Sequence, residues 1–314
     1  ELNKENLFKF KFKEHNLSEA NIDAIKGFDA VCVFVNDNVS KQIIDAIVGN
    51  GIKTLLLRCA GFNNVDIDYA KAKNLQVARV PHYSPYAVAE HVIALLLTLN
   101  RKTHKAYNRV REGNFSLKGL VGFDLYRKSF GILGLGNIGK VLMQITLGFG
   151  CKVLVYDPFI KEPFNHPNIK VVDLDYLFAN SDIISLHCPL TRDTEKIINN
   201  NSINKMKDGV YIINTSRGKL IDTKAAIAGL KSRKIGGLGI DVYEEEENLF
   251  FTDRSEDIIE DDTFERLSSF NNVLITAHQA FLTKEALDNI CTTTLNNAKS
   301  LLNNQPALQE NLVT

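Results

Sequence analysis

This sequence has neither an excess of one charge nor a hydrophobic run long enough to cross a membrane. Its 37 basic and 37 acidic residues cancel, and no long block of one sign occurs. Neither nucleic acid nor an anionic membrane is therefore indicated as a partner. The longest strongly apolar run, Val92 to Leu97, is far shorter than the roughly 20 residues of a membrane-spanning helix. Residues 1–15 are charged throughout, which argues against a signal peptide.

Paired cysteines are also missing. The five cysteines are scattered, and none forms a Cys-x-x-Cys motif (Cys32, Cys59, Cys151, Cys188 and Cys291). This usage argues for free thiols in a reducing compartment, and against a disulfide framework or a zinc site. We therefore expect a cytoplasmic protein that holds no metal.

What the chain does contain is enough apolar sequence for two folded domains. Hydrophobic residues make up 45% and charged residues 24% of its 314 residues. Domains usually hold about 100–200 residues each, so this length suits two. Neither internal repeats nor a low-complexity linker are evident.

The clearest motif is a glycine-rich turn between a strand and a helix. An apolar run ending at Leu133 predicts a buried strand, and Gly134, Gly136 and Gly139 follow it before a helical pattern. Such glycines allow the tight turn, the approach of a pyrophosphate to the backbone, and close packing of helix on strand. The next strand ends in Asp157, about twenty residues on, where an acid accepts hydrogen bonds from a ribose 2′-hydroxyl. A carboxylate repels a 2′-phosphate, so the motif favours NAD over NADP.

Strands and helices alternate along the whole chain, which predicts open parallel sheets. Besides the run that ends at Leu133, predicted strands are residues 29–35, 52–57, 76–80, 153–157, 171–172, 183–187, 210–214, 237–240 and 273–276. Helical spacing returns at 284–302 with no strand after it, so this helix is expected to pack back on the first domain. The expected domains are a discontinuous substrate domain, residues 1–83 with 280–314, and a nucleotide domain, residues 84–279.

Residues 84–99 predict a helix that is apolar nearly all round. Ser84 suits its N-cap, and Pro85 suits its first turn. Such a helix should be buried between domains or between subunits. We therefore expect a homodimer or a homotetramer.

Candidate catalytic groups follow three successive predicted strands. Arg217 comes after one strand, an acidic run (residues 244–247) after the next, and His278 after the last. Each has an ordinary alternative: a solvent-exposed arginine, a solvated acidic loop, and a structural histidine. Their joint arrival at strand ends, where ligands bind in open α/β sheets, favours a site instead. The other histidines, His91 among them, lie on loops or helix faces and are weaker candidates; His187 is expected to line the cofactor cleft.

Four stretches resemble the signature blocks of the D-isomer-specific 2-hydroxyacid dehydrogenases: Gly134-Leu-Gly-Asn-Ile-Gly139, Asn214-Thr-Ser-Arg-Gly218, Asp241-Val-Tyr-Glu244 and Thr276-Ala-His278. Residues 58–64, 185–191 and 278–283 are most similar to the fermentative, NAD-dependent D-lactate dehydrogenases of that family. The resemblance spans essentially the whole chain. It implies an α/β fold of two Rossmann-like or flavodoxin-like, doubly wound parallel-sheet domains with a cleft between them. It also implies reversible hydride transfer from NADH to pyruvate, giving D-lactate.

The resemblance also implies a role for each matching position. Arg217 would bind the substrate carboxylate and polarise the carbonyl, His278 would be the acid–base, and Glu246 would hold its imidazolium form. The family's other cofactor-contact positions fall on Asn137, Ile138, Cys188, Pro189, Thr194, Thr215, Ser216 and, as an acid behind the nicotinamide side, Asp241. Its substrate-contact positions, besides Arg217, fall on Phe34, Ala60, Gly61, Tyr83 and Phe281.

Alternatives stay open at this point. A glyoxylate or hydroxypyruvate reductase would share these motifs, because one methylene changes binding by only about 1–3 kcal/mol. A non-enzymatic, NAD-sensing protein resembling the family's corepressors would keep the glycine loop alone. The chain also starts about where the family's first helix would end, so either upstream residues are absent from this sequence or the first domain is naturally truncated.

Overall fold

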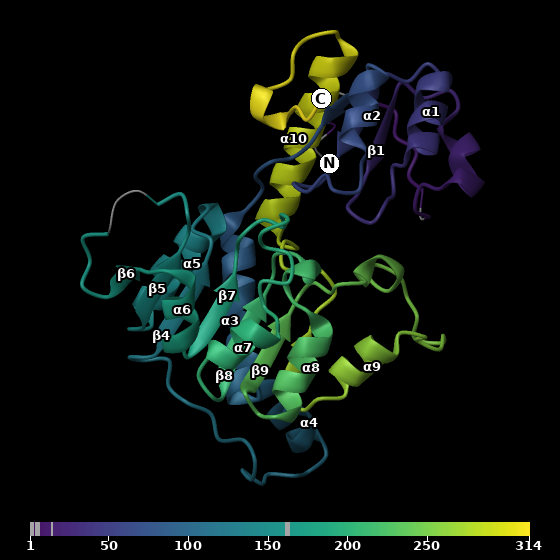
Figure 1. Ribbon diagram of the computed structural model, residues 1–314. Helices are drawn as coiled ribbons and strands as arrows, with labels where there is room; N and C mark the ends of the chain where they lie inside the picture. Colours follow the sequence, from purple (N-terminus) through teal and green to yellow (C-terminus); the bar gives the residue numbers. More distant parts are fainter. Residues whose placement is uncertain (1–2, 4–6, 14, 161–163) are drawn as a thin grey trace. The chain divides into compact units, whose positions relative to one another are not determined.

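The computed structural model describes residues 3, 7–13, 15–160 and 164–314 (Figure 1). The chain divides into two units, residues 1–84 with 282–314 and residues 85–281. Neighbouring strands in both sheets run parallel, so the predicted α/β class with parallel sheets in two domains is confirmed. The predicted domain limits, and the assignment of one domain to substrate and one to nucleotide, stay predictions.

The smaller unit contains a three-stranded sheet in the order β1-β2-β3. Its strands are β1 (Ala30–Val33), β2 (Thr54–Leu57) and β3 (Gln76–Ala78). Its connecting helices are α1 (Lys41–Gly49) and α2 (Ile67–Ala72), and a short 3-10 helix, η1 (Glu19–Ile25), precedes β1. Strand β2 is buried along its whole length, which explains its continuous apolar sequence.

Helix α10 (Lys284–Leu302) packs in the smaller unit, although it follows the last strand of the larger one. Its N-terminus is capped by Thr283, whose side chain accepts from the Ala286 N–H. Near its C-terminus, Ala298 and Leu301 pack with Leu56 of β2 in one buried cluster. The chain then passes through a 3-10 turn, η4 (Gln309–Asn311), and returns to the edge of β3.

The larger unit is built on a seven-stranded sheet in the order β10-β9-β8-β7-β4-β5-β6. Its strands are β4 (Ser129–Leu133), β5 (Lys152–Tyr156), β6 (Ile169–Val171), β7 (Ile183–Leu186), β8 (Val210–Asn214), β9 (Ile235–Ile240) and β10 (Val273–Ile275). The chain builds outward from β4 through β5 and β6, and then returns to β7 on the other side of β4. Ligands of open parallel sheets bind at the carboxyl ends of the strands at such a switch point.

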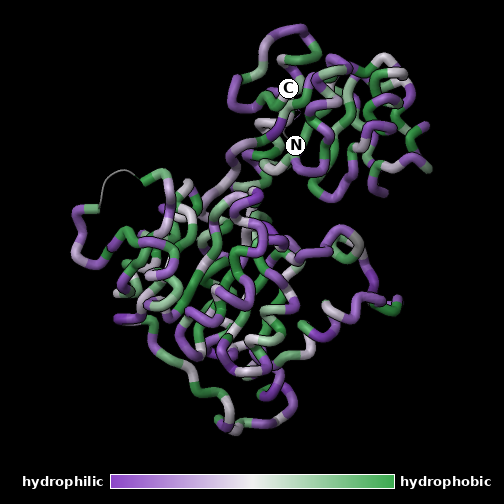
Figure 2. The backbone as a smooth tube through the Cα atoms, in the orientation of Figure 1, coloured by the Kyte–Doolittle hydropathy of each residue, from purple (hydrophilic) through white to green (hydrophobic). Residues whose placement is uncertain are grey.

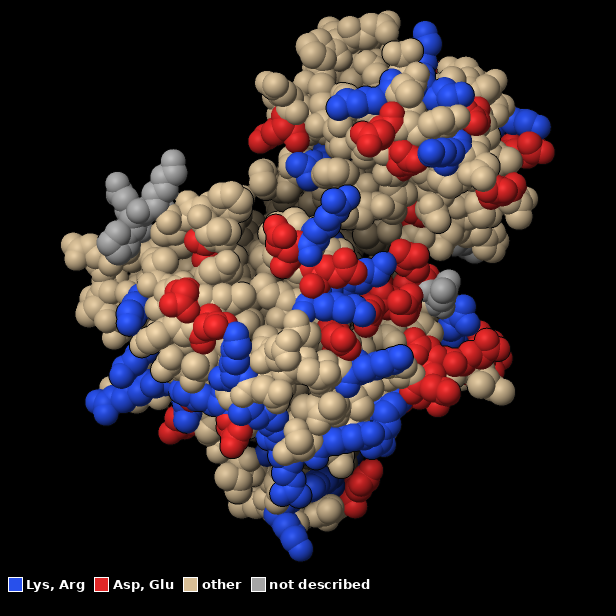
Figure 3. Space-filling model, in the orientation of Figure 1, with Lys and Arg blue, Asp and Glu red and all other residues tan. Residues whose placement is uncertain are grey.

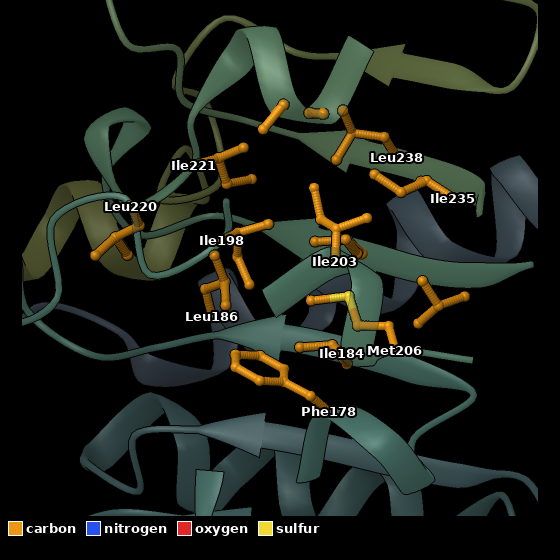
Figure 4. Close-up of a cluster of buried hydrophobic side chains, with 14 of the residues drawn as sticks. Phe178, Ile184, Leu186, Ile198, Ile203, Met206, Leu220, Ile221, Ile235 and Leu238 are labelled. Atoms are coloured by element: carbon orange, nitrogen blue, oxygen red, sulfur yellow. The ribbon is translucent and has the colours of Figure 1, made fainter. Parts of the chain in front are cut away.

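Helices cover both faces of this sheet. One buried cluster includes residues of α3 (Pro85–Arg101) and α5 (Asn137–Gly148). The other includes residues of α6 (Leu174–Asn180), α7 (Asn200–Lys205), α8 (Thr223–Lys231) and α9 (Asp262–Ser268). Alternate strand residues supply the two clusters, as the twofold period of a strand requires: Ile183 faces α3, whereas Ile184 faces α7. Figure 4 shows the second cluster around Phe178, Ile203 and Met206, and the hydrophobic colour of Figure 2 follows the interior strands.

Two helices of the larger unit are not evident from the sequence. Helix α4 (Thr103–Arg111) buries none of its residues, so no apolar stripe marks it. Helix α9 buries only Leu267. Helix α3, in contrast, buries nine of its residues. Six of them belong to the buried cluster that it shares with α5, which accounts for much of its apolar sequence.

Candidate functional site

The glycine loop lies between β4 and α5, at the switch point of the larger sheet. Gly134 has φ +93°, and a Cβ there would lie 2.6 Å from the backbone nitrogen of Cys188, so only glycine fits. A Cβ on Gly139 would lie 2.2 Å from the carbonyl oxygen of Gly134. The loop is therefore held tightly between the end of β7 and the first turn of α5.

Gly136 is different, because the protein itself gives no reason for a glycine there. Its φ is −67°, which any residue adopts, and a Cβ would meet no described atom within 4 Å. It is the N-cap of α5, where free N–H groups and the helix dipole attract an anion. A ligand that lies against the backbone would explain this glycine, so the loop fits the dinucleotide predicted from the motif.

Asp157 follows β5 and bonds to the backbone of the loop. Its carboxylate accepts the Leu135 N–H at 2.7 Å and the Phe159 N–H at 2.9 Å. Each oxygen keeps a further lone pair with which to accept a hydroxyl. The predicted contact with a ribose stays a prediction.

Further predicted cofactor positions follow β7 and β8 and are held by hydrogen bonds to backbone carbonyls. The Ser216 hydroxyl donates to the Cys188 carbonyl at 2.9 Å, and the Thr194 hydroxyl donates to the Pro189 carbonyl at 2.6 Å. The Thr215 hydroxyl is buried and has no hydrogen-bond partner among the described residues. An unpaired buried hydroxyl costs free energy, so this atom too suits a bound ligand.

Burial keeps the two titratable groups at the end of β7 uncharged. It lowers the pKa of His187 to about 4 and raises the pKa of Cys188 to about 11. His187 instead forms a 2.8 Å hydrogen bond with the Ser185 hydroxyl. Its place beside the loop agrees with a lining role, and it carries no charge there at neutral pH.

The three candidate catalytic groups follow β8, β9 and β10, which are neighbours in the sheet. Parallel strands end at the same edge, so the loops bearing Arg217, Glu246 and His278 emerge side by side. The first two loops approach each other closely at Gly218, where an added Cβ would lie 2.0 Å from the Tyr243 carbonyl oxygen. A side chain at position 218 would therefore separate the arginine loop from the acidic one.

His278 and Glu246 form a direct pair. The Nδ1 atom of His278 lies 2.8 Å from Oε1 of Glu246, with the side chains 16% and 19% exposed. The other Glu246 oxygen accepts the Tyr243 N–H at 2.8 Å, which fixes the carboxylate. Because Nδ1 faces the glutamate, Nε2 is the nitrogen left to meet a substrate.

Glu244, a neighbour in the same acidic run, has other partners. Its carboxylate accepts the Thr223 hydroxyl at 3.0 Å and lies 3.0 Å from the Lys196 ammonium. Acidic side chains gather on the surface around the segment that contains α9 (Figure 3). Only the glutamate that pairs with His278 therefore suits the predicted partner role, and that glutamate is Glu246.

The Arg217 side chain leaves its loop on the same edge of the sheet. Its carbonyl accepts the Asn214 side-chain N–H at 2.8 Å, and one guanidinium nitrogen donates to the Ser216 carbonyl at 2.7 Å. It is half-buried, and it forms no ion pair among the described residues. A guanidinium with donors to spare is suited to a bidentate carboxylate contact.

Asp241 is completely buried, at 0% exposed, and lies behind this group. Its carboxylate accepts the N–H groups of Gln279 and Ala280, at 2.9 and 2.8 Å. Its own carbonyl accepts the His278 N–H at 2.7 Å. Asp241 therefore holds the loop of residues 276–280, and its predicted role on the cofactor side stays a prediction.

Besides Arg217, four predicted substrate positions lie in the smaller unit and one, Phe281, in the larger. Phe34 is 8% exposed, and the Arg58 guanidinium lies 4.1 Å from its ring centre. The Ala60 carbonyl accepts an Arg79 guanidinium N–H at 2.9 Å, and the Gly61 carbonyl accepts the Cys59 thiol at 3.2 Å. Tyr83 is anchored through its carbonyl, which accepts from the side chain of Asn289 at 2.6 Å.

One neighbour of the site gave no sequence signal. The ring of Phe251 lies 5.8 Å from that of His278, centre to centre. It sits in the irregular segment after Glu246, where neither spacing nor motif marks it. Only the fold brings it to the histidine.

Among the described residues, no group of three or more His, Cys, Asp or Glu side chains is placed to hold a metal ion. Within the same residues, no helix combines the length and apolar character needed to span a bilayer.

Comparisons with known proteins agree on one family. Residues 93–280 match the family described as D-isomer specific 2-hydroxyacid dehydrogenase, NAD binding domain. The D-lactate dehydrogenase of Escherichia coli is 50% identical over 294 residues, covering 94% of this chain and 89% of that protein. Its apo structure superposes with a TM-score of 0.88 at 45% identity, covering 100% of this chain and 94% of that one. The Aquifex aeolicus D-lactate dehydrogenase complexed with NAD and lactic acid has a TM-score of 0.88 at 34% identity, covering 99% and 95% of the two chains.

Proposed function

Since the chain belongs to the D-isomer-specific 2-hydroxyacid dehydrogenase family, we propose that it reduces pyruvate to D-lactate with NADH, reversibly. The observation that carries this proposal is the His278–Glu246 pair, at the same sheet edge as Arg217 and the glycine loop. The protein is an NAD-dependent oxidoreductase, and the pyruvate substrate is supported by relatives that are named D-lactate dehydrogenases.

Each residue of the site has its own role in the proposed reaction. NADH would supply the hydride when bound, and Gly136 with the N-terminus of α5 would hold its pyrophosphate. Arg217 binds the pyruvate carboxylate and places the carbonyl. His278 donates the Nε2 proton to the carbonyl oxygen as the hydride reaches the carbonyl carbon, and Glu246 stabilises the charged imidazole through Nδ1. One hydride and one proton are consumed for each lactate.

Residues other than Arg217, Glu246 and His278 would contact the cofactor and the substrate. On the nucleotide side they are Gly134, Asn137, Ile138, Gly139, Asp157, Cys188, Pro189, Thr194, Thr215 and Ser216, with Asp241 behind them. On the substrate side they are Phe34, Ala60, Gly61, Tyr83 and Phe281. The aromatic members would leave room for the methyl group of pyruvate.

Initial rates of NADH oxidation test the substrate. We expect kcat/KM for pyruvate to exceed that for glyoxylate and for hydroxypyruvate, and the lactate formed to be the D isomer. A preference for either of the other acids would identify a related reductase. Tight NADH binding with no turnover of any 2-oxo acid would instead support an NAD-sensing binding protein.

We also propose that the protein is a homo-oligomer, a dimer at least. Residues 103–126 support this, because they expose large apolar side chains: Tyr107 (62%), Val110 (55%), Phe115 (75%), Leu117 (80%) and Val121 (83%). Exposed apolar surface on this scale marks interaction sites. Light scattering on the native chain and on Val121→Asp is the test, and a native monomer would overturn this proposal.

We also propose that the protein is cytoplasmic. All five cysteines are free, and two of them, Cys59 and Cys151, are buried. Free thiols are usual where glutathione and thioredoxin keep them reduced. Fractionation of cells that express the protein tests this, and recovery from an oxidising compartment would contradict it.

A further inference from the structure

His91 occupies an unusual place for a polar residue. It lies on α3 at the head of the stripe His91, Leu95 and Leu99, which recurs every four residues and therefore faces one way. This stripe packs on β9, where an added Cβ on Gly239 would lie 3.1 Å from Leu99 Cδ1 and 3.4 Å from Leu95 Cβ. The helix therefore lies close against the sheet, and His91 reaches the end of β10 with 17% of its side chain exposed.

Its partner there is Thr276. The Nε2 atom of His91 lies 3.0 Å from the Thr276 hydroxyl, which in turn lies 2.5 Å from Oδ1 of Asp241. A hydroxyl has one hydrogen, and a carboxylate can only accept, so Thr276 donates to Asp241. The hydroxyl must then accept from His91, and Nε2 of His91 carries a hydrogen. The same Nε2 atom also lies 3.5 Å from Oδ1 of Asp241 itself. Donation therefore runs one way, from His91 towards Asp241, with the shorter route through Thr276.

Asp241 links this hydrogen-bond chain to the loop that contains the acid–base histidine. Its Oδ1 atom also accepts the Gln279 N–H, its Oδ2 atom accepts the Ala280 N–H, and its carbonyl accepts the His278 N–H. The loop is thus fixed before, at and after His278. That restraint matters because His278 has φ +52°, a left-handed conformation that a residue with a Cβ adopts at a cost.

We propose that His91 is a positioning residue for the acid–base histidine, acting through Thr276 and Asp241. It never touches the substrate; its hydrogen bond orients the Thr276 hydroxyl, and that orientation holds the 276–280 loop in the conformation that aims His278. The proposal rests on the proposed dehydrogenase activity. The alternative is a histidine that only satisfies its own hydrogen bond inside the larger unit.

The test compares kcat, KM for pyruvate, the NADH dissociation constant and the melting temperature across variants. His91→Leu removes the donor, Thr276→Val removes the relay, and His91→Gln retains a side-chain N–H. Glu90→Gln, a change at an exposed neighbour on the same helix, is the control. Loss of a hydrogen bond that acts only on the reacting geometry should lower kcat roughly tenfold, with NADH binding unchanged.

We expect His91→Leu and Thr276→Val to lose similar amounts of kcat, and their combination to lose no more than either alone, since both break one relay. His91→Gln should recover most of the loss. Native kcat in His91→Leu, additive losses in the double variant, or losses explained by weaker NADH binding would each overturn the proposal. If either His91→Leu or Thr276→Val fails to fold, the kcat of the other variant tests the proposal. Failure of the native protein on every 2-oxo acid would instead refute the proposed function itself.

Discussion

The Nδ1 atom of His278 lies 2.8 Å from a carboxylate oxygen of Glu246, and the two residues are 32 positions apart in the chain. The fold therefore pairs a proton donor with an acid before any substrate arrives. The acid has a second anchor in the Tyr243 N–H, so it cannot easily turn away. We take this pair as the centre of the site.

Replacing Glu246 with glutamine tests the pair. The amide keeps the size of the side chain but removes the charge that stabilises the imidazolium form of His278. We expect kcat with pyruvate to fall on the order of 100-fold, within the usual range for acid–base groups, while the NADH dissociation constant is unchanged. Glu245→Gln is the matched control, since Glu245 is exposed, and it should leave both quantities as they are.

Gly136 and Gly134 should respond differently to alanine. Gly136→Ala is expected to weaken NADH binding by at least about tenfold, or 1.4 kcal/mol, and to leave the free energy of unfolding nearly unchanged, because the new methyl meets no protein atom. Gly134→Ala should destabilise the protein by about 2 kcal/mol or more, since it adds a clash at positive φ. Fluorescence titration and denaturant unfolding measure the two effects. Equal losses of stability would contradict the assignment of Gly136 to a ligand.

Arg79→Met tests the substrate loop of the smaller unit. The guanidinium of Arg79 donates to the Ala60 carbonyl and stacks on the Phe62 ring at 5.1 Å. Without it, the predicted substrate contacts at Ala60 and Gly61 should lose their fixed position. We expect KM for pyruvate to rise about tenfold, the equivalent of one hydrogen bond, with no change in NADH affinity. Lys71→Met, an exposed change in the same unit, is the control and should leave both KM and NADH affinity unchanged. An unaltered KM in Arg79→Met would show that Arg79 does not position the substrate loop.

Stability should depend on pH through His187. Burial lowers its pKa from 6.5 to about 4, so between these values the unfolded chain takes up a proton that the folded chain does not. The free energy of unfolding must then decrease as the pH falls through this window, by at most about 3 kcal/mol. The loss should be smaller than this limit, because His187 keeps part of its surface exposed.

His187→Gln should remove this component. Urea unfolding at pH 7 and at pH 4.5 measures it in both proteins. The variant is expected to lose less stability on acidification than the native chain, and an identical loss would refute the assignment.

The nucleotide loop could be predicted from the sequence because its parts are contiguous. Strand, glycines and helix follow one another within residues 128–148, so local spacing alone encodes the turn. The candidate catalytic residues could be predicted because each stands in a short block after a strand. The pairing of His278 with Glu246, and not with Glu244, depended on family resemblance, and the structure adds the distances.

The remainder could not be predicted, for physical reasons. His91 and Thr276 are 185 positions apart, and His91 is hidden in an apolar stripe that looks like ordinary core. Helix α4 buries nothing, so no periodicity marks it. Phe251 reaches His278 from an irregular segment, where no repeating pattern applies. For His91 and Phe251 the signal is a long-range contact, which a local pattern does not contain.

The most direct test of the account is the oxidation of NADH by pyruvate, measured in parallel for the native protein and for His278→Ala, with the chirality of the lactate and the NADH dissociation constant determined for both. We predict D-lactate from the native enzyme and a loss of at least about 100-fold in kcat for the variant, with NADH binding retained. A variant that keeps native kcat, or a native protein that forms L-lactate, would contradict the central claim.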